Sequence, residues 1–129
     1  MVEVVPLEEE FLTMLRETVN LKATDVDIKN GFASISKILR KYLMQKYQVS
    51  AMEQTSAQLL SALQEKQLNE TIYKQVDEIL RLCDLAKFAG SMGDQKDLFR
   101  VYTLMETILE KNLTEGSAEA KLEKAAEEK

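Results

Sequence analysis

The residues most able to do chemistry lie in one segment, RLCDLAKFAGSMGD, which runs from Arg81 to Asp94. Asp84 and Lys87 stand there among apolar residues. Residues three apart are neighbours on a helix surface, so one interpretation is an intrahelical ion pair of Asp84 with Lys87, beside Phe88. An exposed pair of this kind contributes roughly 0.3–0.5 kcal/mol. In this interpretation the pair indicates a solvated helix face rather than a site.

A second interpretation pairs Asp84 with a cation from another helix. The segment LRKYL supplies Arg40 and Lys41, and the planar guanidinium of arginine binds a carboxylate in a geometry that would fix how two helices pack. A third interpretation has Asp84 contact a partner. We therefore predict a polar contact region between helices, called the polar seam, formed by Arg40, Lys41, Asp84, Lys87 and Phe88. Its main expected role is structural, and binding of a partner is the second.

Cys83 is the only cysteine, and its spacing places it on the apolar stripe of its helix. A free cysteine in such a position behaves as a small hydrophobic residue, so we predict a core residue. The alternative, a reactive thiol, would need cations close by, and neither Arg81 nor Lys87 is spaced to face it. A single cysteine cannot form a disulfide within the chain.

Histidine is absent from the sequence. The chain therefore lacks the commonest general base and the commonest transition-metal ligand, and it has no Cys/His zinc set. It shows no glycine-rich phosphate loop, no calcium loop and no Ser/His/Asp set. We interpret Glu8, Glu9 and Glu10 as solvating charge at a helix start. The prediction is a protein without cofactor, metal or catalytic activity, and a catalytic pair of carboxylates stays an open alternative.

The overall charge is acidic, with a formal net charge of −5 and a pI near 4.9. Nucleic-acid-binding proteins usually present a basic surface, so we expect no nucleic-acid partner. One segment is locally basic because it carries Lys37, Arg40, Lys41 and Lys46. Such a face suits an anionic lipid surface or, more commonly, the solvated face of a protein of mixed charge.

The elements that must position these residues are helices. Apolar residues recur at three- and four-residue steps, and only four glycines and one proline interrupt the chain. This periodicity is typical of amphipathic helices, and no strand pattern is evident. It predicts five helices, over residues 6–21, 25–47, 55–65, 70–89 and 95–112. Because the apolar stripes must face one another, we predict an all-α fold, a compact bundle of about five helices.

Local signals predict several helix ends. Thr55 and Gln58 have the spacing of a capping box, and Asn69 suits the cap of the helix that follows it. Gly90 suits the left-handed residue that ends a helix, and Asp94 suits the next cap.

Two further residues bear on where helices begin. Pro6 suits the first position of the first helix. Gly31 is expected to weaken the start of the second helix by about 1 kcal/mol relative to alanine. That helix therefore has an alternative start near Asn30.

The composition changes from Thr114 onward. The segment TEGSAEAKLEKAAEEK contains no aromatic or β-branched apolar residue, and Leu122 is its only large aliphatic. Alanine, glutamate and lysine favour helix, but the segment offers no apolar face to dock. We predict a bundle domain over residues 1–113 and a flexible tail, frayed or disordered, over residues 114–129.

Three segments in order carry a family resemblance: FASISKILRKYL over 32–43, TSAQLLSAL over 55–63 and ILRLCDLAKFA over 79–89. Together they resemble the helical cytoplasmic region that follows the last transmembrane helix of BatD-like aerotolerance proteins and related bacterial membrane proteins. The shared pattern is a Leu-Arg-x-Tyr-Leu helix, a Thr-x-x-x-Leu helix and a helix end of the form Asp/Glu-x-x-Lys/Arg-Phe-Ala. The resemblance covers about residues 32–108.

The resemblance implies a cytoplasmic domain at the inner face of the bacterial inner membrane, tethered by a segment outside this chain. It also implies protein partners rather than a substrate. No apolar run here approaches the roughly 20 residues that cross a bilayer, so either the chain is an excised domain or the resemblance misleads about location. We predict a non-catalytic protein–protein interaction module. The alternative is a soluble regulatory or accessory bundle that binds a small ligand between helices, in a pocket lined by Tyr42, Tyr47 or Tyr102.

Overall fold

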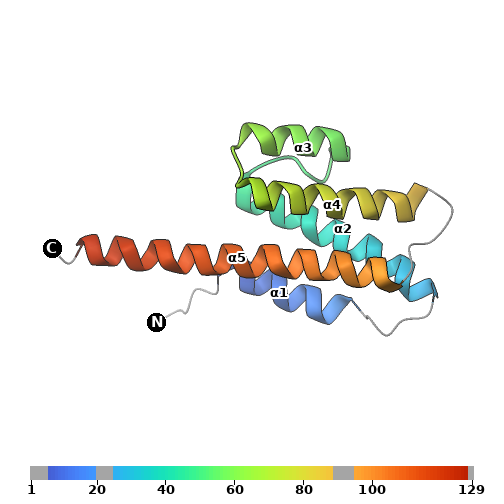
Figure 1. The fold of residues 1–129 in the computed structure, drawn as a ribbon, viewed down its shortest axis with the longest axis horizontal. Helices are drawn as coiled ribbons and strands as arrows, with labels where there is room; N and C mark the ends of the chain where they lie inside the picture. Colours follow the sequence, from blue (N-terminus) through green and yellow to red (C-terminus); the bar gives the residue numbers. More distant parts are fainter. Residues whose placement is uncertain (1–5, 20–24, 89–94, 128–129) are drawn as a thin grey trace.

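The protein is a bundle of five helices (Figure 1). The structure, a computed structural model, describes the backbone of residues 6–19, 25–88 and 95–127, and the side chains of residues 6–19, 28–86 and 95–114. The helices are α1 (Leu7–Thr18), α2 (Asp25–Tyr47), α3 (Ser56–Glu65), α4 (Glu70–Phe88) and α5 (Gln95–Glu127). Within these ranges no strand occurs, and the predicted all-α class is confirmed.

Four of the helices form the body of the bundle. α5 packs against α1, α2 and α4, and α2 packs against α1, α4 and α5. α3 packs on α4, and Figure 1 shows it on the outside of the bundle. The buried apolar side chains of all five helices form one continuous core, as the facing stripes predict.

Two of the predicted caps are confirmed. Thr55 Oγ1 accepts from the backbone N–H of Gln58, and the Gln58 side chain accepts from the N–H of Thr55, which completes the capping box of α3. Asn69 Oδ1 accepts from the N–H groups of Thr71 and Ile72 at the start of α4. The predictions for Gly90 and Asp94 lie outside the described residues.

Among the other helix starts, that of α1 differs slightly from its prediction and that of α2 does not. Pro6 is the N-cap of α1 rather than its first helical residue. α2 begins at Asp25, as the apolar spacing predicts, so the alternative start near Asn30 is wrong.

Gly31 has a packing role that explains why the helix continues through it. A Cβ at Gly31 would lie 2.9 Å from Leu98 Cδ1, and Leu98 is a fully buried residue of α5. The missing side chain therefore allows α2 and α5 to approach closely. This contact offsets the weak helix propensity of glycine.

The last helix is longer than predicted. α5 comprises 33 residues and is helical through Glu127, whereas the predicted helix ends near Asn112. Figure 1 shows it extending past the other four helices. The physical reason is the alanine, glutamate and lysine content of its last turns, which favours helix without a docking face. The frayed or disordered tail over residues 114–129 stays a prediction, because no side chain after Thr114 is described.

Over the described ranges, no helix combines the length and the apolar composition needed to cross a membrane.

Candidate functional site

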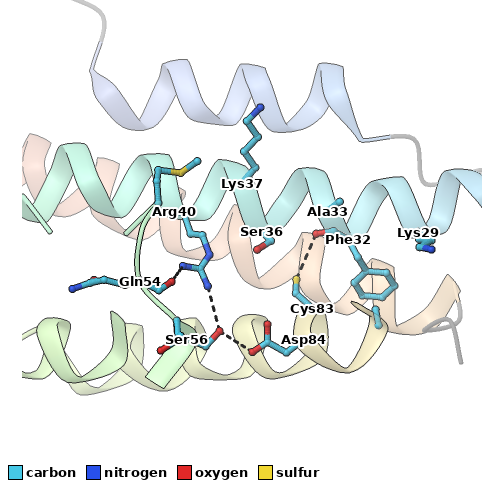
Figure 2. Close-up of a pocket in the computed structure, with 13 residues that line it drawn as sticks. Lys29, Phe32, Ala33, Ser36, Lys37, Arg40, Gln54, Ser56, Cys83 and Asp84 are labelled. Carbon is cyan, nitrogen blue, oxygen red and sulfur yellow. Dashed lines mark hydrogen bonds between the residues drawn. The ribbon is translucent and has the colours of Figure 1, made fainter. Parts of the chain in front are cut away.

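A cavity of about 590 Å³ lies between α2 and α4, next to the connector of residues 48–55 that leads from α2 into α3 (Figure 2). We call it the α2–α4 groove. Its lining comes from three parts of the chain: Lys29, Phe32, Ala33, Ser36, Lys37 and Arg40 of α2, Met52, Gln54, Thr55 and Ser56 around the connector, and Cys83, Asp84 and Ala86 of α4. The lining residues of α2 recur at helical spacing, so the groove follows about three turns of that helix, or about 16 Å.

Arg40 holds the connector against α2. Its Nη1 donates to the carbonyl oxygens of Ala51 and Gln54, both at 2.6 Å, and its Nη2 donates to Ser56 Oγ at 3.3 Å. The chain turns sharply at Gln48, where φ is 57°. Carbonyl groups in such an irregular segment have no ladder of their own and need other donors. The guanidinium supplies them.

Asp84 is joined to Arg40 through Ser56. The Ser56 hydroxyl donates to Asp84 Oδ2 at 2.7 Å and also accepts from Arg40. No ion pair between Arg40 and Asp84 occurs among the described residues, so the predicted direct pair is wrong in that detail. The reason is that two backbone carbonyls already occupy Nη1 of the guanidinium, and Ser56 lies between the two charges.

The structure brings together only part of the predicted polar seam. Arg40 and Asp84 line the same groove, whereas Lys41 is half-buried on α2 and does not line it. The side chains of Lys87 and Phe88 lie outside the described residues, so their roles, and the intrahelical pair of Asp84 with Lys87, stay predictions. Sequence reasoning missed Ser56. Its two contacts lie 16 and 28 residues away in the sequence, so no local pattern signalled them.

Cys83 forms part of the groove floor and is a core residue, as predicted. Its side chain is buried, and Sγ donates to the Phe32 carbonyl oxygen at 3.6 Å. Burial raises the pKa of the Cys83 thiol from its ordinary 9.0 to about 12, with a smaller contribution from the charge of Asp84 and an opposing one from Arg40. The thiol is therefore neutral near pH 7, which suits packing rather than nucleophilic chemistry.

Because of this thiol, the free energy of unfolding is expected to decrease as the pH rises above about 9. The unfolded chain loses the Cys83 proton near pH 9, whereas the folded protein retains it up to about pH 12. Above pH 9 the unfolded state thus binds fewer protons, and the free energy of unfolding should decrease by about 1 kcal/mol per pH unit. Cys83→Ala should lack this slope between about pH 9 and 10. Urea unfolding of both proteins at a series of pH values measures it, and identical slopes would contradict the prediction.

A second hollow, of about 360 Å³, adjoins the connector. It is lined by Met44, Gln48, Val49, Ser50, Met52 and Glu53. Met52 lines both this hollow and the α2–α4 groove. Met44 and Met52 are 38% and 45% exposed, and Leu85 of α4, between two groove-lining residues, is 60% exposed. Large apolar side chains are therefore solvent-accessible around the connector and on α4.

A buried polar cluster lies where α1, α2 and α5 meet. Asn112 Nδ2 donates to the hydroxyls of Tyr42 at 2.7 Å and Tyr47 at 3.1 Å. Glu8 is buried and pairs with Lys46 at 3.0 Å, so its interpretation as solvating charge is wrong, because the first turn of α1 packs against the end of α2. Burial raises the pKa of Tyr42 above its usual range.

The alternative of a small-ligand pocket lined by tyrosine finds no support in this cluster. Tyr42 is fully buried, and none of Tyr42, Tyr47 and Tyr102 lines either hollow. The predicted basic face is also divided, because Lys46 pairs with Glu8 and Arg40 points toward the connector. Among the residues with described side chains, no group of three potential metal ligands occurs.

Comparison of the chain with protein-family models, with curated proteins and with solved structures found no match. The resemblance to BatD-like proteins stays a prediction.

Proposed function

We propose that this protein is a non-catalytic interaction module that holds a segment of a protein partner in the α2–α4 groove. The observation that carries the proposal is the open groove itself, which follows three turns of α2. Small side chains lie on both sides, Ala33 and Ser36 on α2 and Ala86 on α4, so a partner backbone can approach closely. Exposed Met52, which also lines the groove, supplies apolar contact area. Methionine suits such a surface because its side chain adapts to irregular partners.

The chemistry of the groove supports binding rather than catalysis. Arg40 and Asp84 are engaged in holding the connector and α3. The Cys83 thiol is buried, and its raised pKa keeps it neutral. These groups therefore serve to maintain the shape of the groove.

On the resemblance to BatD-like proteins, we further propose that the module works at the cytoplasmic face of a bacterial inner membrane, tethered by a segment outside this chain. Cell fractionation tests the setting. The native protein should sediment with membranes and be released by detergent but not by salt. Recovery in the soluble fraction would overturn the tether and leave the binding proposal unaffected.

A photo-crosslinking residue at Ala33 tests the groove as the binding surface. Ala33 is exposed and lines the groove, whereas Ala57 of α3 is exposed and does not. A protein crosslinked from position 33 but not from position 57 would be identified by mass spectrometry, purified and titrated. Ala33→Trp, which fills the groove, should then weaken its binding at least tenfold.

Ala57→Trp is the matched control and should bind the purified partner as the wild type does. Both variants should keep the wild-type unfolding midpoint, because each replaces an exposed alanine. Equal crosslinking from the two positions, or unchanged affinity of Ala33→Trp, would overturn the proposal.

A further inference from the structure

The α2–α4 groove is cationic on an acidic protein. Three of its lining residues are cations, Lys29, Lys37 and Arg40, and one is a carboxylate, Asp84. The whole chain, in contrast, has a formal net charge of −5. Positive potential concentrated in a groove attracts segments of opposite charge and orients them. The charge of the groove therefore favours an acidic partner.

The two lysines are available to a partner, in contrast to Arg40. Lys29 and Lys37 are exposed, whereas Arg40 is committed to the Ala51 and Gln54 carbonyls. Figure 2 shows Lys37 leaving α2 on the side away from Asp84, so it lines the groove at its α2 edge rather than inside it, and it shows Lys29 at the opposite end of the groove from Arg40. The lysines stand eight residues apart in the sequence, which corresponds to about 12 Å along the helix axis.

The shape of the groove favours a helical occupant. Its walls are the two helices α2 and α4, and the small residues Ala33, Ser36 and Ala86 face it. Helices pack at interaxial distances of about 8–10 Å, and small side chains at the contact allow the closer end of this range. Addition of a partner strand would need an exposed sheet edge, and the described ranges contain no strand.

We infer that the partner segment is a short amphipathic helix of about three turns, with an apolar stripe toward the groove floor and two acidic residues that pair with Lys29 and Lys37. This inference rests on the function proposed above and specifies the chemistry of its partner. The apolar stripe packs along Phe32 and Ala86, with the exposed Met52 beside them. The two carboxylates stand seven or eight residues apart, to match the separation of the lysines.

The probe is a synthetic helical peptide with leucine and alanine at three- and four-residue spacing and two glutamates seven residues apart. A second peptide carries lysine in place of both glutamates. Fluorescence anisotropy with the full chain at low salt should detect binding of the acidic peptide and at least tenfold weaker binding of the basic one. The double variant Lys29→Glu/Lys37→Glu should reverse this preference. The matched control Lys74→Glu/Lys96→Glu changes the net charge equally at exposed positions outside the groove and should retain the wild-type preference.

Three results would overturn the inference. The first is equal affinity for the two peptides. The second is that neither peptide binds. If Ala33→Trp still weakens binding of the purified partner in that case, the proposed function stands and only the inference of an acidic helical partner fails. If Ala33→Trp has no effect either, both fail. The third is a dimer of the chain, seen by analytical ultracentrifugation, that Lys29→Glu/Lys37→Glu dissociates, because the occupant is then a second copy.

Discussion

Arg40→Met is expected to lower the free energy of unfolding by about 3 kcal/mol, since hydrogen bonds from a charged donor contribute about 1.5–3 kcal/mol each. The variant removes the donor to Ala51 and Gln54 and the contact with Ser56. Ala51 is fully buried, so water cannot easily replace the lost donor at its carbonyl. The methionine side chain keeps most of the aliphatic packing of arginine. Urea unfolding followed by circular dichroism measures the loss.

Lys41→Met is the matched control for this change. Lys41 is the next residue of α2 and makes no ion pair with another described residue, so its loss should stay within about 0.5 kcal/mol. Arg40→Lys should recover only part of the stability, because an ammonium group cannot reproduce the fork that reaches two carbonyls. Equal unfolding midpoints for Arg40→Met and Lys41→Met would show that the connector does not depend on the guanidinium.

Asn112→Leu is expected to cost about 2 kcal/mol, because it leaves a buried hydroxyl without its partner. Asn112 donates to Tyr42, which has no exposed surface. Leucine has the same number and branching of side-chain heavy atoms as asparagine, so the variant leaves no cavity and the missing hydrogen bond dominates. Tyr47 also loses a donor, but it is only half-buried, and water can compensate there. Thermal or urea unfolding gives the difference.

The double variant Tyr42→Phe/Asn112→Leu should be nearly as stable as the wild type. Removing both polar partners together leaves no orphaned group, which is close to neutral when shape is preserved. The edge-to-face contact of the Tyr42 ring with Phe11, with centroids 5.4 Å apart, is retained by phenylalanine. A double-mutant cycle should therefore show a coupling of about 1–2 kcal/mol between the two positions. Simple additivity of the two losses would contradict a functional hydrogen bond.

The helices and several of their ends were predictable because their causes are local. The Thr55–Gln58 capping box and the Asn69 cap form between residues at most three apart, so residue types and spacing are sufficient to predict them. The apolar stripes likewise predict an all-α bundle, since each stripe must be buried. The extension of α5 through Glu127 was missed because the prediction rested on an apolar docking face, whereas helix propensity acts without one.

The candidate site was predictable only in part. Arg40 and Asp84 were chosen from their residue types, and both line the groove. Ser56, which joins them, was not chosen, because its role depends on contacts 16 and 28 residues away in the sequence. The pairing of the buried Glu8 with Lys46, 38 residues apart, was missed for the same reason.

By itself, then, the sequence determined which segments are helical, where the confirmed caps lie and which side chains are apolar, because neighbouring residues decide these properties. Only the tertiary structure decided that α3 lies on α4 and that a groove follows α2. It also decided that Gly31 provides room for Leu98. Each of these depends on the angle and distance at which distant helices pack, and many sequence-distant contacts set that geometry together.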